Sequence, residues 1–151
     1  MMQPDPAEAE REIAAQIETY RQGFLHLDPD EIASIWDAHH DPLIYVAQEK
    51  TEPTYGWPAI HSYLAALPEH VEKIVAKELK DLKIDVVGDA ALAFFNSHST
   101  IRLRGVQGLH ETDFRVTMLF HRTPDGWRVI HFHESALSAQ AARALDQFSR
   151  T

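Results

Sequence analysis

Apolar residues in the first part of the chain recur at the spacing of an amphipathic helix. They lie three or four positions apart and are Ile13, Ile17, Tyr20, Phe24 and Leu27. Asp5-Pro6-Ala7-Glu8 precedes them, with an N-cap aspartate before a proline at the first helical position. The same signal returns at Asp28-Pro29-Asp30-Glu31, so we expect a second helix there, which extends to His39 before Asp41-Pro42 interrupts it.

The middle of the chain alternates between strand and helix signals. Residues 43–46 are apolar and partly β-branched, which predicts a short strand. Residues 55–58 lead into a third helix that ends at Pro68. Residues 69–80 give conflicting signals, because they favour a helix by propensity but also show an irregular alternation of apolar and polar residues. We expect a loop or helical turn that becomes a strand near Glu78.

The second half of the chain alternates with the period of β-strands. Residues 82–86 alternate, Gly88-Asp89 predicts a turn, and residues 90–104 form one long strand. Residues 112–135 read as a hairpin with its turn at Pro124-Asp125-Gly126. The order helix, helix, strand, helix and four strands predicts an α+β fold in which a curved, mainly antiparallel sheet wraps around N-terminal helices as a cone. One domain, 1–151, is expected, with a core of about 8–137.

A last helical pattern follows this core. Its apolar positions are Leu137, Ala141, Ala144, Leu145 and Phe148. We expect a short C-terminal helix there.

Alternation along the last strand separates two faces. The first face is predicted to carry Trp127, Val129, His131, His133 and Ser135. The opposite face is predicted to carry Arg128, Ile130, Phe132 and Glu134. Because neither set is uniformly polar, we expect helices to cover one face and a second copy of the chain to cover the other, giving a homodimer through the outer sheet face.

Composition narrows the possible partners. Among the 151 residues, 14 Lys and Arg stand against 23 Asp and Glu, a formal charge of -9 that disfavours nucleic acid and anionic membranes as partners. The chain has no cysteine, which excludes disulfides, thiol nucleophiles and thiolate metal sites. Since no apolar run is long enough to span a bilayer, we expect a cytoplasmic protein.

The hairpin and the strand before it carry a resemblance to a known superfamily. Residues 87–91, Asp125-Gly126-Trp127 and the run from Val129 to His133 resemble, in order and spacing, the association domain of calcium/calmodulin-dependent protein kinase II. The chain is thereby identified as similar to the nuclear transport factor 2-like, or SnoaL-like, superfamily over residues 13–135. Tyr20, Asp28 and Trp36 are also similar to the first helices of ketosteroid isomerases in that superfamily. The resemblance implies the cystatin-like cone fold.

Two positions depart from these relatives. Association domains carry a pocket arginine directly after His-Phe-His, whereas this chain has Glu134 there. Isomerases of the superfamily use an aspartate near the first strand, whereas residues 45–49 offer only Glu49 as a carboxylate. The isomerase mechanism therefore does not transfer directly, and the charge preference of the pocket is expected to be reversed.

Glu134 is the main candidate for chemistry. On a strand face with Ile130 and Phe132, a carboxylate should resist ionisation, which brings its pKa toward the range of a general acid or base. The alternatives are a salt bridge to Arg102, Arg104 or Arg115, or an exposed strand end. His61 on the third helix is a second proton-transfer candidate, although an exposed position suits it equally.

Other residues are expected to line a pocket at the mouth of the cone. They are mostly aromatic, since buried tyrosine hydroxyls need polar partners and can orient a ligand. The predicted ligand-binding residues are Tyr20, Trp36, Tyr45, Trp57, Tyr63, Phe95, Ser97, Met118 and Phe132.

His131 and His133 point the same way on their strand and could hold a metal together with His121 or His98. Hydrogen bonding within the sheet or across a dimer contact explains them better. We therefore expect neither a metal nor a cofactor to be required.

Together these patterns predict a dimeric cone domain that binds a small, partly apolar molecule. Acid-base chemistry of the isomerase, dehydratase or hydrolase kind is the leading hypothesis. The alternative is a non-catalytic association module that uses only its outer sheet face.

Overall fold

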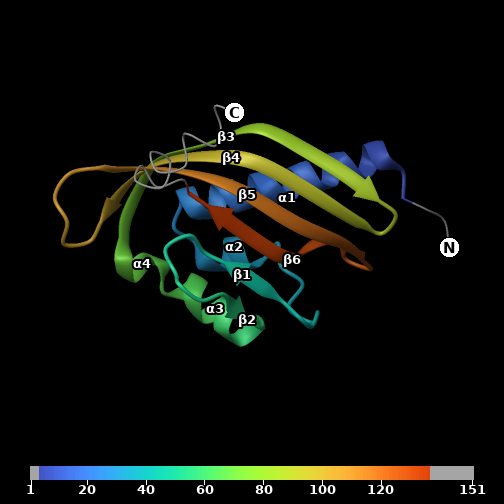
Figure 1. Ribbon diagram of the computed structural model, residues 1–151, viewed down its shortest axis with the longest axis horizontal. Coiled ribbons are helices and arrows are strands. Elements are labelled where there is room, and N and C mark those ends of the chain that lie inside the picture. Colours follow the sequence, from blue (N-terminus) through green and yellow to red (C-terminus); the bar gives the residue numbers. More distant parts are fainter. Residues whose placement is uncertain (1–3, 137–151) are drawn as a thin grey trace, which may run out of the picture.

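The computed structural model describes residues 4–136, and its elements form helices packed on one side of a curved sheet (Figure 1). In chain order they are α1 (Pro6–Leu25), α2 (Pro29–Ala33), β1 (Ile44–Val46), β2 (Thr54–Tyr55), α3 (Trp57–Ala65), α4 (Leu67–His70), β3 (Val71–Val87), β4 (Ala90–Leu103), β5 (His110–Thr123) and β6 (Gly126–Ser135). The predicted C-terminal helix lies outside the described residues. No helix within 4–136 is long and apolar enough to cross a membrane.

The first two helices begin where the sequence signals place them. Asp5 caps α1 by accepting a hydrogen bond from the Ala7 amide at 3.1 Å, and Asp28 caps α2 through the amides of Asp30 and Glu31. The predicted second helix is nevertheless too long. It ends at Ala33, because the segment that follows pairs with β6 instead.

The sheet has six strands in the order β2-β1-β6-β5-β4-β3. The β1–β6 pair is parallel and the other pairs are antiparallel, as the α+β prediction requires. The two-residue strand β2 was not predicted, because two residues show no alternation. In Figure 1, α1 runs beneath the long strands while α2, α3, β1 and β2 gather along one side. This is the predicted cone.

Strand β3 is much longer than the sequence pattern indicated. The expectation of a loop or helical turn up to Glu78 is wrong, since β3 begins at Val71 and pairs with β4 throughout. Register shifts between Val71 and Lys73, between Ile74 and Ala76, and again near Lys80 interrupt its alternation. After each bulge, the side chains point to the opposite face of the sheet from the one that simple alternation predicts. The buried positions of β3 therefore do not recur at every second residue.

A bulge also divides β6. The β5–β6 register shifts by one residue at Ile130. Trp127 and Val129 before the bulge, and Phe132 and Glu134 after it, are therefore all buried. The prediction that Trp127 and Val129 share the outer face with the histidines is wrong, because the extra residue reverses the alternation midway along the strand.

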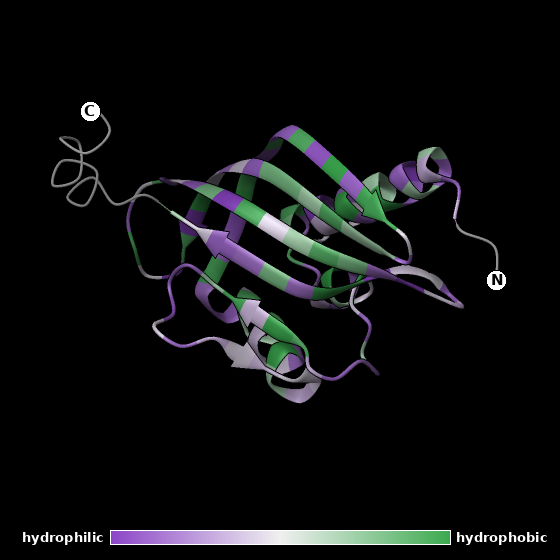
Figure 2. Cartoon of the chain, turned by 45° about the vertical axis from the view of Figure 1, so that its right-hand side comes forward, coloured by the Kyte–Doolittle hydropathy of each residue, from purple (hydrophilic) through white to green (hydrophobic). Residues whose placement is uncertain are grey.

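Apolar and polar residues are interspersed along the strands of the sheet (Figure 2), and both kinds are exposed on its outer face. Leu92 and Phe94 of β4 are 46% and 37% exposed. Arg115 and His133 on β5 and β6 are also exposed, whereas the inward residues of these strands are fully buried. This face thus has the mixed character predicted for a contact surface.

Candidate functional site

Glu134 lies near the end of β6 with its side chain turned into the cone. The residue is 8% exposed and pairs across the strands with Val116 of β5. Its neighbour His133 pairs with Val46 of β1, so the connection that follows β1 lies beside the carboxylate. The Gln48 backbone amide donates a hydrogen bond to it. The hairpin and β1 together hold a carboxylate inside a mainly apolar core.

Burial changes the acidity of this group. Removal from water raises the pKa of Glu134 from 4.5 to about 7, and the charge of Glu49 adds to the rise. The charge of Lys77 and the Gln48 amide act in the opposite direction. The cation that stabilises the carboxylate is Lys77, not one of the arginines considered from the sequence. Glu134 consequently exchanges its proton near neutral pH.

Lys77 of β3 is the second buried charged group, with 6% of its surface exposed. Its ammonium donates hydrogen bonds to the hydroxyls of Ser97 at 3.0 Å and Ser99 at 3.3 Å on β4. The same nitrogen lies 5.2 Å and 5.1 Å from the ring centroids of Tyr20 and Phe24 on α1, which are cation–π distances.

The environment of Lys77 also moves its pKa toward neutrality. Burial lowers the pKa of the amine from 10.5 to about 8; the carboxylate of Glu134 opposes this change, and the charge of Arg21 adds to it. Two groups that exchange protons near neutral pH thus share one interior. Lys77, Ser99 and Gln48 were not predicted as site residues. Lys77 lies beyond two bulges, in the segment that was expected to be a loop. The pattern of apolar and polar residues therefore did not predict that its side chain points inward.

Three tyrosines lie within the electrostatic influence of Glu134. Burial and then the charge of Glu134 raise the pKa values of Tyr20 and Tyr45, so both phenols stay protonated. The pKa of Tyr63 is raised by burial and by its hydrogen bond to the Glu49 carboxylate. Protonated phenols can donate hydrogen bonds to a ligand oxygen.

Most of the predicted ligand-binding residues pack against one another as an aromatic cluster inside the cone. Tyr45 stacks on Phe132 with ring centroids 4.7 Å apart, and Tyr20 lies 5.5 Å from the same ring. Trp36 stacks on Tyr45 at 5.8 Å and contacts the Trp57 ring. The other members of the predicted set, Phe95, Ser97 and Met118, are buried on β4 and β5. The structure therefore brings this set together, mostly as core side chains.

His61 is placed elsewhere. It is exposed on α3, where its ring lies 5.5 Å from the Trp57 ring. The structure does not bring it to Glu134.

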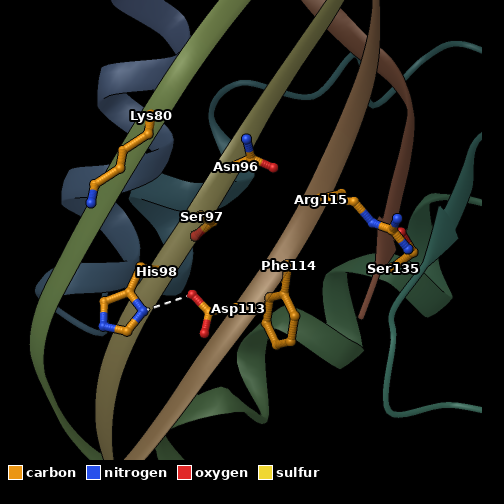
Figure 3. A pocket seen from close by; sticks show the side chains of 8 residues that line it. All are labelled: Lys80, Asn96, Ser97, His98, Asp113, Phe114, Arg115 and Ser135. Atoms are coloured by element: carbon orange, nitrogen blue, oxygen red, sulfur yellow. Dashed lines mark hydrogen bonds and ion pairs between the residues drawn. The ribbon is translucent and has the colours of Figure 1, made fainter. Parts of the chain in front are cut away.

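A pocket of about 480 Å³ opens across β3, β4, β5 and the end of β6, and is lined mainly by outward-facing polar groups (Figure 3). Lys80 and Arg115 contribute positive charge, and His98 Nδ1 lies 2.8 Å from an Asp113 carboxylate oxygen. Ser97 is the one predicted ligand-binding residue in its lining. The pocket is thus on the opposite side of the sheet from the Glu134 carboxylate, and its mostly charged and polar residues differ from the aromatic lining expected from the sequence.

The cone, with its helices on one side of a six-stranded curved sheet and a buried carboxylate and amine inside, is that of a cystatin-like α+β domain. A family model described as the SnoaL-like domain matches residues 13–139, and the chain belongs to that family. A search of curated protein sequences gave no significant match.

Solved structures agree on the fold. A candidate dehydratase of the nuclear transport factor 2-like family from Streptomyces avermitilis is 20% identical with a TM-score of 0.78, covering 89% of this chain and 100% of its own. A Caulobacter vibrioides protein with a cystatin-like fold is 19% identical with a TM-score of 0.74, covering 95% and 99%. A candidate calcium/calmodulin-dependent protein kinase II association domain from Xanthomonas campestris is 17% identical with a TM-score of 0.71, covering 92% and 96%. At these identities the similarity establishes the fold alone.

Proposed function

We propose that the interior of the cone binds a small, partly apolar molecule and that Glu134 transfers a proton to or from it. The observation that carries this proposal is the burial of the carboxylate, which places its pKa at about 7. A general base works best when its pKa lies near the working pH, because enough of it is ionised while it still attracts a proton strongly. A carboxylate needed only for folding gains nothing from such a position.

Lys77 supports this proposal by supplying the complementary charge. With pKa values of about 7 and about 8, Glu134 is largely ionised and Lys77 still largely protonated in the interval between them. In that interval the carboxylate accepts a proton from a carbon next to a carbonyl group, and the released electron pair moves to the carbonyl oxygen. The Lys77 ammonium and the tyrosine hydroxyls then stabilise the enolate that forms.

The walls of the interior favour a flat, partly apolar substrate. Tyr45, Phe132 and Trp36 stack on one another inside the cone, and an interior rich in aromatic rings suits a cyclic or aromatic compound. Enolate formation is the step shared by the isomerase and dehydratase reactions, and the Streptomyces avermitilis neighbour is itself a candidate dehydratase. An isomerase returns the proton from Glu134 to another carbon, and a dehydratase breaks the bond to a hydroxyl group, which leaves as water with that proton.

Hydrogen–deuterium exchange tests this proposal without knowledge of the final product. A panel of cyclic ketones is incubated with the protein in D2O, and deuterium at the carbon next to the carbonyl is followed by NMR. We expect catalysed exchange with at least one ketone, a rate that rises through about pH 7 as Glu134 ionises, and loss of exchange in Glu134→Gln. Glu72→Gln, an exposed strand carboxylate, is the matched control. Exchange that is absent throughout the panel, or that persists in Glu134→Gln, would contradict the proposal.

A second candidate function is self-association through the outer sheet face, with or without chemistry inside the cone. Leu92 and Phe94 are exposed there, and both signs of charge, Arg115 and Asp113, lie on the same face. Such a surface is complementary to a second copy of itself related by a two-fold axis. The neighbour from Xanthomonas campestris, a candidate association domain, supports this use of the fold.

A further inference from the structure

We propose that Asp37, His40 and His121 form a binding site for a divalent transition-metal ion of the Zn²⁺ type. One potential ligand atom from each residue lies within 4.8 Å of the others. All three side chains are half-buried. The residues come from two segments that the fold brings together, the turn after α2 and strand β5, and they are separate from the Glu134 interior. His121 follows the inward-facing Phe120, which places it on the outer side of β5.

The backbone around this cluster is fixed before any ion binds. The Asp37 amide donates to the Val129 carbonyl at 3.0 Å, and the Val129 amide donates to the Ile35 carbonyl at 2.8 Å. His121 lies on β5, in register with Ala90 on one side. The β5 ladder holds His121, and a backbone hydrogen bond to β6 holds Asp37, so the positions of these two ligands are more precise than those of a free loop.

Hydrogen bonds also orient the carboxylate. One Asp37 oxygen, Oδ1, accepts from the His39 amide at 3.0 Å, while Oδ2 lies 2.7 Å from His121 Nε2. The His40 and His121 rings meet edge to face with centroids 4.7 Å apart. Carboxylates that bind metals are commonly oriented by an outer hydrogen bond of the kind that Oδ1 accepts here, which leaves Oδ2 as the ligand atom.

A metal ion takes the place of the hydrogen bond between His121 Nε2 and Asp37 Oδ2. The neutral imidazole then carries its proton on Nδ1, and the Nε2 lone pair forms the coordinate bond. The ion accepts one further lone pair from His40 and one from Asp37. Binding therefore weakens as the pH falls.

The donor set selects the kind of metal. Two imidazole nitrogens and one carboxylate oxygen suit zinc, cobalt, nickel or ferrous iron, whereas calcium and magnesium prefer sites made of oxygens alone. Half-burial leaves a coordination position open to water. The alternative is a plain His121–Asp37 ion pair that fastens the turn after α2 to β5, and this pair predicts no specific metal affinity.

Titration of tag-free protein, treated with a chelator and dialysed, separates these possibilities. We expect one equivalent of Zn²⁺ to bind in calorimetry, and Co²⁺ to develop a visible absorption band. His40→Ala, His121→Ala and Asp37→Asn should each weaken binding by at least about tenfold. Asp37→Asn preserves the shape of the side chain while replacing one carboxylate oxygen by an amide NH2 group. The matched control is the double variant His131→Ala/His133→Ala, which removes the other outer-face histidine pair and should leave the affinity unchanged.

A measurement on the wild-type protein makes the test independent of variant folding. The ring nitrogens of His40 and His121 should shift in NMR spectra when Zn²⁺ is added, while those of His98, an exposed histidine beside Asp113, should not. No heat, no Co²⁺ band and no shift of these rings would overturn the proposal. Binding that survives in both histidine variants, or that disappears in the control, would also overturn it. Folding need not depend on the ion, since hydrogen bonds already hold both segments.

Discussion

Replacement of Glu134 by glutamine removes the charge from the interior of the cone while keeping the size of the side chain. In the folded protein, burial holds the pKa of Glu134 at about 7, above its ordinary value of 4.5. Below pH 4.5 the carboxyl group is protonated in the folded and unfolded states alike, and its burial carries no ionisation cost. As the pH rises from 4.5 to about 7, the unfolded chain ionises first and the folded state becomes relatively less stable.

The magnitude follows from the difference between the two pKa values. At about 1.4 kcal/mol for each pKa unit, the rise from 4.5 to about 7 corresponds to a cost of about 3 kcal/mol above neutral pH. Glutamine resembles the protonated acid and does not incur this cost. Because the variant also leaves the Lys77 ammonium without its counter-charge, about 3 kcal/mol is the upper limit of the gain.

Urea unfolding followed by tryptophan fluorescence measures the effect, since the chain contains 3 tryptophans. The quantity to compare is the free energy of unfolding of Glu134→Gln minus that of the wild type, at about pH 4 and about pH 8. This difference should increase by 1 to about 3 kcal/mol between the two pH values. Constant effects of the substitution on packing cancel in the comparison. Glu72→Gln, at an exposed position of β3, should give no such increase.

A difference that falls between the two pH values would refute the reasoning. It would mean that the carboxylate is ionised and stabilised by partners in the folded state. A difference that stays constant would mean that the group is hydrated. Either result would also remove Glu134 as the proposed proton-transfer group.

Further predictions concern Lys77, the outer face and metal dependence. Lys77→Met removes the cation that favours the ionised carboxylate, so the pKa of Glu134, measured by NMR of a labelled side chain, should rise above about 7; an unchanged value would place the two groups too far apart to interact. Phe94→Glu should convert a dimer into a monomer in light scattering, because it introduces charge into an exposed apolar position of the outer face, and a strictly monomeric wild type would exclude this contact. If His131 and His133 lie in that contact, acidification from about pH 8 to about pH 6 should weaken association, since two nearby cations repel; an association constant independent of pH would place them elsewhere. Chelator-treated protein should keep the secondary structure of untreated protein in circular dichroism, and loss of that structure would show that folding requires a metal.

The sequence predicted those parts of the fold that depend only on neighbouring residues, such as helix caps and the alternation within one regular strand. Proline and aspartate fix the start of α1, and the unbroken alternation of β4 matches its observed span within one residue. Glu134 was predicted to have a raised pKa because alternation places it on one strand face with Ile130 and Phe132. Phe132 does lie on the same inner face, whereas Ile130 is the bulge residue. That part of the prediction needed only a short stretch of regular strand.

Bulges account for much of what could not be predicted. A bulge depends on how two strands pair, so a single strand's pattern contains no direct sign of it. The inward direction of Lys77 follows two register shifts in β3, and the burial of Trp127 follows from one at Ile130. The cluster of Asp37, His40 and His121 joins segments more than eighty residues apart, which no spacing rule connects.

The bulge at Ile130 also makes β6 a strand of two independent parts. Residues 126–129 complete the packing beside Trp36, while residues 131–135 carry the carboxylate and pair with β1. The two parts have separate registers, so a change in the second does not reposition the first. Exchange of the segment after Ile130 between SnoaL-like proteins should therefore replace the interior carboxylate while Trp127 and Val129 keep their packing. The bulge is a natural boundary for recombination within a single strand.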